Sequence, residues 1–406
     1  MNAQDLFAKA LNLTDPWKVT DCHLEQSLCI SIDFQAGARF PCPHCQQPSR
    51  VHDTNTKVLR HLNIFEHETY LSVRAPRVHC DKHGVHQIEL PWSRPGSGFT
   101  LLFEGLVLTF APKMAMSHIA NYLNVHDTLL WRMIQWHITD ARLRIDFSKV
   151  KNIGIDETAS QRGHEYITIA VDLDTKRALF ATPGKDSDCI RQVAIELAKH
   201  GCPPEQIQTI ACDLSASFTS GIKKYFPLAT ITYDRFHVTK LVTDAVKETR
   251  RDEMAEDYWK RELLKGHNLT LVTNETNQTA DQKNAIKAIT LSLLNLKSGR
   301  AYKLKLAFQD AYAFGEDQLS KWCKWAARSK LPAFMRVAKT IRSHWDGIVS
   351  WYNTKVTSAI MEGYNSLFQS ARSRARGYRN VSYFINMVYL VAGSLDFIAT
   401  YPTHTK

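Results

Sequence analysis

The sequence predicts a multidomain α/β protein: a zinc ribbon, a helix-turn-helix, then a mixed sheet with flanking helices and a long all-helical stretch. Three observations support this. Two pairs of cysteine and histidine ligands lie within residues 41–90, the apolar residues of 99–148 recur with helical spacing, and after residue 149 three strands precede alternating helices and strands. With 406 residues, the chain exceeds the roughly 250–300 residues at which a single core stops growing.

The charge balance favours a polyanionic partner. The chain has 51 Lys and Arg against 40 Asp and Glu, a formal net charge of +11. Such a surplus favours nucleic acid ahead of a membrane surface. A merely basic protein fits the charge equally well, so the motifs must decide between the two.

Nothing in the sequence predicts a membrane span or secretion. No run of about 18 apolar residues is present, and the first residues lack the basic start and apolar stretch of a signal peptide. We therefore expect a cytoplasmic protein with no membrane partner, whose thiols stay reduced. Its nine cysteines are then core residues or metal ligands.

The zinc ribbon is predicted from two ligand pairs. Residues 1–40 read as a short helix and strands, and the pairs follow as Cys42-Pro-His-Cys45 and Cys80-Asp-Lys-His83. Two intervening residues let both side chains of a pair reach one Zn²⁺, and two pairs complete a tetrahedron. His44 and His79 lie nearby but lack the pair spacing. The alternative is an unrelated Cys-x-x-Cys and a chance Cys-x-x-His.

A helix-turn-helix is predicted behind the segment 92–98, whose Pro, Gly and Ser residues are typical of a linker. Residues 116–123 form a short amphipathic helix, 124–127 supply the turn with Asp127 as N-cap, and 128–137 form the second helix. Many helical hairpins share this pattern, so its meaning depends on its neighbours.

The second helix of this motif is predicted to have one buried and one DNA-facing side. Leu129, Met133 and Trp136 are expected on the buried face, and Arg132 and Gln135 are expected to point towards a DNA groove.

Two aspartates are predicted at the ends of buried strands. Asp156 ends the first strand of the large domain, and Asp213 ends the apolar run 207–213. If both strands are central in one sheet, the carboxylates approach within metal-bridging distance. Two ions ~3.5–4 Å apart activate water and stabilise the leaving oxygen in a phosphoryl transfer, and Mg²⁺ prefers such oxygen ligands. Each aspartate could instead cap a helix or a turn.

A third carboxylate is expected from a helix packed on the sheet. Glu362 is one of three acids after residue 331 and lies on a predicted helix over 357–368. Arginines after it are typical of phosphate binding beside a metal ligand; they are Arg372, Arg374, Arg376 and Arg379. The alternative for Glu362 is a solvated acid on an exposed face.

Together these segments resemble the ISL3 family of insertion-sequence transposases, and the likeness covers nearly the whole chain. It rests on the ribbon pairs and on four further segments, Gly154-Ile-Asp156-Glu157, Phe226 to Val238, Glu362-Gly-Tyr-Asn365 and Gly377-Tyr-Arg-Asn380. The chain departs from the family pattern at His83, where a fourth cysteine is usual.

The resemblance implies a DDE triad of Asp156, Asp213 and Glu362 on an RNase H-like fold, holding Mg²⁺ or Mn²⁺. It also implies a bacterial, nucleoid-associated enzyme that cleaves and joins DNA at terminal inverted repeats in a synaptic multimer. The expected domains are N-terminal strands at 1–40, the ribbon at 41–90, the helix-turn-helix at 99–148, and the catalytic domain at 149–406 with a helical insertion at about 240–350.

Two choices stay open in the sequence. Asp234 also ends a strand and competes with Asp213; we interpret Asp234 and His237 as an accessory pair, although His237 could equally be a capping residue. The rival functions are a DNA-binding regulator that no longer cuts and a ribonuclease H-like nuclease acting on hybrids. The second leaves the ribbon and the helix-turn-helix without a role.

Overall fold

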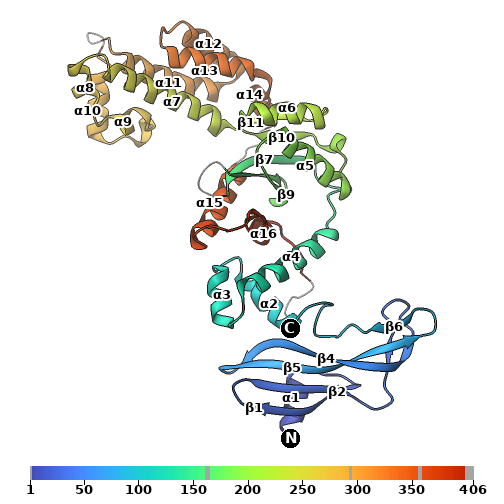
Figure 1. The fold of residues 1–406 in the computed structure, drawn as a ribbon. Helices are drawn as coiled ribbons and strands as arrows, with labels where there is room; N and C mark the ends of the chain where they lie inside the picture. Colours follow the sequence, from blue (N-terminus) through green and yellow to red (C-terminus); the bar gives the residue numbers. More distant parts are fainter. Residues whose placement is uncertain (1, 161–164, 292–294, 355–358, 398–406) are drawn as a thin grey trace.

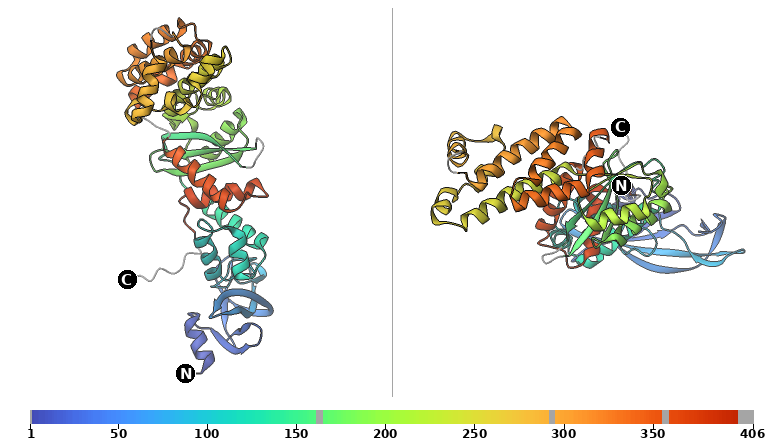
Figure 2. Two further views of the ribbon diagram at one scale, coloured as in Figure 1. Left: turned by 90° about the vertical axis from the view of Figure 1, so that its left-hand side faces the viewer. Right: turned by 90° about the horizontal axis from the view of Figure 1, so that it is seen from above.

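The computed structural model describes residues 2–160, 165–291, 295–354 and 359–397. The molecule is elongated, with its parts in line (Figure 1). An N-terminal sheet lies at one end, followed by three helices, a second sheet with its covering helices, and a group of helices at the other end. The same order is seen from the side in Figure 2.

The N-terminal sheet is one continuous unit. Its strands are ordered β1-β2-β5-β4-β3, with β6 on the free part of β5. Because β2 pairs parallel to β5, the N-terminal strands and the ribbon segment, predicted as separate parts divided at residue 40, share one sheet and one core. The elements are α1 Ala3–Ala10, β1 Trp17–Leu24, β2 Leu28–Phe34, β3 Arg39–Pro41, β4 Pro48–Ile64, β5 His67–Cys80 and β6 Gly84–Gln87.

Three helices follow the sheet: α2 Leu101–Phe110, α3 Met116–Leu123 and α4 Asp127–Leu143. The prediction of Asp127 as N-cap is wrong, because His126 holds that position and Asp127 is the first helical residue. Leu129 and Trp136, predicted as buried, are 41% and 38% exposed.

The buried face of α4 is displaced because the helix extends to Leu143 and packs on α16 Val381–Ala392 as well as on α3. Its buried residues are Leu130, Trp131, Met133, Ile134, His137, Ile138 and Ala141. Met133 is buried as predicted.

The segment 92–98 is irregular, as predicted, but it is held tightly. Phe99 forms a parallel bridge with Arg60 on β4. Arg94 and Ser97 donate hydrogen bonds to the fully buried carboxylate of Glu104, at 3.0 and 2.5 Å. His137 of α4 lies 2.6 Å from the same carboxylate. These contacts fix the sheet against the helices that follow.

The second sheet has the order β11-β10-β7-β8-β9. Strands β7 to β9 are antiparallel neighbours, and β10 and β11 run parallel to β7. One face packs in a core with α5 and α6, and the other with α15 and α16. The strands are β7 Asn152–Ala159, β8 Tyr166–Asp172, β9 Arg177–Pro183, β10 Thr209–Cys212 and β11 Thr230–Tyr233; the helices between them are α5 Ser187–Lys199, η1 Pro204–Gln206 and α6 Ala216–Tyr225.

From Arg235 to Thr354 the described residues form helices joined by turns and loops. They are α7 Arg235–Met254, α8 Tyr258–Leu264, α9 Asn268–Val272, η2 Glu275–Asn277, α10 Ala280–Ile289, α11 Lys297–Phe314, α12 Glu316–Ala327, α13 Pro332–Ser343 and α14 Trp345–Thr354; α15 Ala359–Arg374 returns to the sheet. The first two residues of the predicted helix 357–368 lie outside the described residues. Within the described chain, no helix is both long and apolar enough to cross a membrane.

Candidate metal centres and nucleic-acid interface

The four predicted ribbon ligands meet at one point. One ligand atom from each of Cys42, Cys45, Cys80 and His83 lies within 4.8 Å of the others. The Sγ atoms of Cys45 and Cys80 are 3.7 Å apart, and Nδ1 of His83 lies 3.5 and 3.8 Å from Sγ of Cys80 and Cys42. Ligands at about 2.0–2.3 Å from a tetrahedral Zn²⁺ are separated by such distances. The donor set therefore fits zinc.

The local backbone favours the thiolate form of one ligand. The backbone N–H of Lys82 and the imidazole of His83 lower the pKa of Cys80 to about 6. Thiolate is the form that binds metal. His44 and His79 are not part of the cluster: His44 packs against His83 and His86, and His79 against His52.

Asp156 lies in the middle of β7, so its predicted place at the strand end is wrong. β7 continues along β8 as far as Ala159, whereas β10 pairs with β7 only as far as Gly154. Asp156 therefore stands just beyond the point where the two parallel strands separate. Asp213 directly follows β10 at the same place, and its Oδ1 accepts a hydrogen bond from Ser215 N at 3.0 Å.

The two aspartates interact through their charges. Burial raises the pKa of Asp156 to about 6, and the carboxylate of Asp213 raises it too. The backbone N–H of Glu157, the imidazole of His237 and the amide of Asn365 lower it, with less effect than burial. The pKa of the neighbouring Glu157 is also raised, by burial above all. A buried group of carboxylates with little cationic compensation is a donor set suited to a hard divalent cation.

Helix α15 runs along β7 in register. Met361 lies over Gly154, Asn365 Nδ2 donates to Asp156 Oδ2 at 2.7 Å, and Gln369 Nε2 donates to Thr158 Oγ1 at 2.7 Å. Four residues of helix rise by ~6 Å, close to the ~6.6 Å of two strand residues, so every fourth helix residue meets every second strand residue. Arg372 continues the series by donating to Ala159 O at 2.7 Å.

Glu362 is exposed and faces a neighbouring cavity of about 430 Å³. It shares this cavity with Asp234 and Arg235 at the start of α7 and with the aromatic rings of Phe308 and Tyr312. In the described part of the chain, the oxygens of Asp156, Asp213 and Glu362 are not all within 4.8 Å of one another. The structure therefore pairs Asp156 with Asp213 and places Glu362 beside Asp234.

Asp234 and His237 occupy the end of β11 and the first turn of α7. The Asp234 carboxylate accepts a hydrogen bond from Phe236 N at 3.0 Å and so caps α7. His237 Nε2 lies 3.9 Å from Asp234 Oδ2, and its charge lowers the pKa of both Asp156 and Glu157. His237 thus lies between the two carboxylate groups.

The predicted DNA-binding arginines follow α15 around a groove of about 600 Å³. Arg372, Arg376 and Arg379 line it together with Ser160 at the end of β7. Arg374 points elsewhere and donates to the carbonyls of Pro112 and Lys113 between α2 and α3. In the helix-turn-helix, Arg132 and Gln135 are exposed on α4, as expected of groove-facing residues.

Several residues of this site were not predicted. Glu157, Lys185, Asn365 and Gln369 are within electrostatic or hydrogen-bonding reach of the aspartates or of β7. Asn365 and Gln369 are three and seven positions beyond Glu362, and this helical spacing was the available signal. Nothing in the local sequence marks Lys185, whose charge lowers the pKa of Glu157.

Comparison with known proteins gives matches over most of the chain. A family model of the ISL3 type described as a transposase matches residues 153–388. A zinc-finger model of transposases IS204/IS1001/IS1096/IS1165 matches residues 38–83, and a model of the helix-turn-helix domain of transposase family ISL3 matches residues 88–137. Together they cover both candidate metal centres and helices α2 to α4.

Relatives with full-length similarity carry the same description. The transposase for insertion sequence element IS1001 of Bordetella parapertussis is 26% identical over 392 residues, covering 91% of each chain. The transposase for insertion sequence element IS1557 of Mycobacterium tuberculosis (strain CDC 1551 / Oshkosh) is 25% identical over 380 residues, covering 86% of this chain and 85% of the relative.

Proposed function

Because the chain belongs to the ISL3 family of insertion-sequence transposases, we propose that it binds the terminal inverted repeats of its own element and cuts and rejoins DNA there. Asp156, Asp213 and Glu362 are the catalytic carboxylates, on an RNase H-like sheet with the helices α7 to α14 as an insertion. The observation that carries this proposal is the meeting of Asp156 and Asp213 where β7 and β10 separate.

The three carboxylates would hold Mg²⁺ or Mn²⁺. Such ions, when bound, activate water and neutralise charge on the phosphate. The residues of this chain supply the rest: Asn365 orients the carboxylate of Asp156, and His237 places a proton donor between Asp156 and Asp234. Assembly of the triad requires Glu362 to approach Asp156, which fits a synaptic complex that forms only on DNA.

DNA would extend from the helix-turn-helix to this site. Arg132 and Gln135 would contact base edges, while Arg372, Arg376 and Arg379 would bind backbone phosphates next to Ser160. Arg374, by binding the loop between α2 and α3, would hold the helix-turn-helix and the arginine groove together along one path.

The test is metal-dependent nicking of DNA that carries the ends of the element. The wild-type chain should nick in Mg²⁺ or Mn²⁺, and Asp156→Asn should abolish nicking while leaving end binding intact. Asp174→Asn, an exposed aspartate in the turn between β8 and β9, is the matched control and should nick normally. End binding without nicking by the wild type would instead support the regulator.

The same assay separates the two candidates for the second aspartate. Asp213→Asn should abolish nicking, whereas Asp234→Asn should reduce it and weaken the capping of α7. Normal nicking by Asp213→Asn, with none by Asp234→Asn, would reverse the two assignments.

A further inference from the structure

The tip of the β4–β5 hairpin carries an exposed phenylalanine. Ile64 pairs with His67, and Phe65 and Glu66 form the turn between them. Phe65 is 90% exposed, more than any other large hydrophobic side chain in the described residues. An apolar ring held in water at a hairpin tip gives nothing to the core of the isolated chain.

The backbone at Phe65 is also strained. Its φ is +55°, and Glu66 is not in the positive range. A positive φ at the first of two turn residues is typical of hairpins in which glycine takes that position. A bulky residue there costs roughly 1–3 kcal/mol and persists where the surroundings hold it. The sequence therefore keeps a phenylalanine where glycine is favoured.

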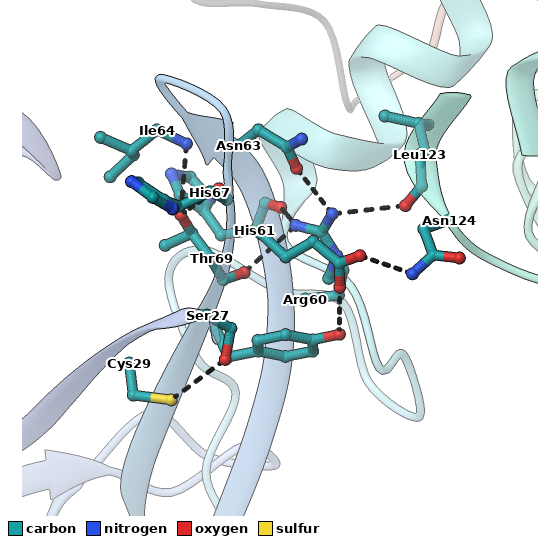
Figure 3. Close-up of polar contacts among 12 residues, drawn as sticks. Ser27, Cys29, Arg60, His61, Asn63, Ile64, His67, Thr69, Leu123 and Asn124 are labelled. Atoms are coloured by element: carbon teal, nitrogen blue, oxygen red, sulfur yellow. Dashed lines mark hydrogen bonds and ion pairs between the residues drawn. The ribbon is translucent and has the colours of Figure 1, made fainter. Parts of the chain in front are cut away.

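A buried polar cluster holds the tip from below (Figure 3). Thr69, fully buried, accepts a hydrogen bond from Ile64 N and donates one to His67 O, both at 3.2 Å. Arg60, 5% exposed, donates to Thr69 O at 3.3 Å and to Asn63 Oδ1 at 2.6 Å. Side chains and backbone of both strands are thus fixed next to the turn.

The same cluster joins the tip to the helix-turn-helix. Arg60 Nη2 donates to Leu123 O at the end of α3, at 3.3 Å. Asn124 Nδ2 donates to Glu68 Oε1 at 2.6 Å, and this bond holds the pKa of Glu68 below its usual value. Asn124 is the left-handed residue, with φ 52°, that ends α3 before α4. The hairpin tip and the turn of the helix-turn-helix therefore move as one body.

We propose that this tip, Ile64 to His67, is a second DNA-contacting element that inserts Phe65 into the minor groove beside the major groove entered by α4. The inference rests on the proposed binding of the element's ends. A recognition helix begins at the turn of its motif, and its first residues face the major groove. A hairpin fixed to that turn reaches the flanking groove, where phenylalanine is a common wedge between base steps. The partner is duplex DNA because the tip continues the surface of the helix-turn-helix.

Glu66 distinguishes DNA from a second copy of the chain as the partner. Its side chain is 83% exposed and lies 3.9 Å from His67. Close to phosphates a carboxylate is repelled, so Glu66→Gln should tighten DNA binding and make it less sensitive to salt dilution of that repulsion. A change in self-association, with DNA binding unaltered, would contradict the proposal.

The central experiment uses Phe65→Gly in the full chain, with thermal unfolding and binding measured on the same preparation. Glycine relieves the strain, so the melting temperature should stay the same or rise. Affinity for a duplex carrying the element's own terminal repeat should fall roughly tenfold, because the wedge is lost. Phe314→Ala, at an 80% exposed phenylalanine at the end of α11, is the control and should bind as the wild type does.

A second readout reports the wedge directly. With 2-aminopurine placed in the repeat next to the contacted steps, wild-type binding should raise its fluorescence by unstacking, and Phe65→Gly should not. Equal affinity and equal fluorescence for Phe65→Gly and wild type would refute the wedge while leaving end binding intact. Failure of the wild type to bind the repeat would instead refute the proposed function.

Discussion

Among the single residues of the proposed active site, Asp156 is the one whose charge is most costly. Its surroundings are buried, and its nearest charged neighbours include another carboxylate, Asp213. Asn365 and the backbone N–H of Glu157 supply hydrogen bonds, which offset only part of the cost of burial. Such strained electrostatics are typical of sites that await a cation or substrate.

This raised pKa predicts a pH-dependent stability. The folded pKa of Asp156, about 6, lies above that of an unfolded aspartate, about 3.9. The folded state then binds the extra proton, so stability falls as pH rises from about 4 to 6 and stays lower above it. Asp156→Asn should raise the free energy of unfolding by roughly 1–3 kcal/mol at pH 7.5 without metal, and by little at pH 4.

Urea unfolding at the two pH values measures this difference. Asp174→Asn, at an exposed site, should show no such dependence. Equal effects of Asp156→Asn at pH 4 and pH 7.5 would show that the carboxylate is not destabilised by burial.

At the scale of elements, the register of α15 on β7 decides which side chains meet. The contact between Met361 and Gly154 begins the series that continues through Asn365 and Gln369. A Cβ at position 154 would lie 2.9 Å from Leu173 Cδ2 and 3.1 Å from Met361 Sδ. Glycine at this position therefore permits the close approach of the helix to the strand that carries Asp156.

Gly154→Ala should displace α15 and impair catalysis. Overpacking of this kind typically costs about 1–3 kcal/mol, and a shift of about 1 Å in a catalytic group can reduce the rate roughly a hundredfold. Nicking should fall by one to two orders of magnitude while end binding persists. Gly363→Ala, on the same helix with nothing within 4 Å of its Cβ, should keep activity and gain up to about 1 kcal/mol from helix propensity.

At the scale of the whole molecule, contacts between elements distant in sequence join the parts into one path. Arg60 and Asn124 join the N-terminal sheet to the helix-turn-helix. Arg374 joins the helix-turn-helix to α15, which packs on β7. The zinc ligands lie at the far end of β5 from the hairpin tip, about 40 Å away along the strand.

Zinc removal should therefore act on DNA binding through the sheet. Chelation is expected to melt the end of the sheet that holds β3 and β6, with loss of β-sheet circular dichroism and weaker binding of the element's ends, both restored by Zn²⁺. A Cys42→Ser variant should already show the chelated spectrum, whereas Cys323→Ser, at a buried thiol remote from the cluster, should respond as the wild type does. An unchanged spectrum after complete zinc removal would contradict a structural role.

The sequence by itself determined the features that depend on neighbours along the chain. The Cys42/Cys45 and Cys80/His83 pairs, helix α3 over its predicted residues, and the order of strands and helices after residue 149 could all be predicted. Ligand spacing and hydrophobic periodicity are local quantities, so local reasoning recovers them.

Only the tertiary structure decided which distant residues meet. It placed Asp156 in mid-strand, because β8 extends the pairing of β7 after β10 has left it. It turned Leu129 and Trp136 outwards, because α16 sets the buried face of α4. It brought Glu362 beside Asp234 and fixed Phe65 beside the helix-turn-helix through Arg60. These arrangements follow from strand pairing and packing over long sequence separations, which no local pattern encodes.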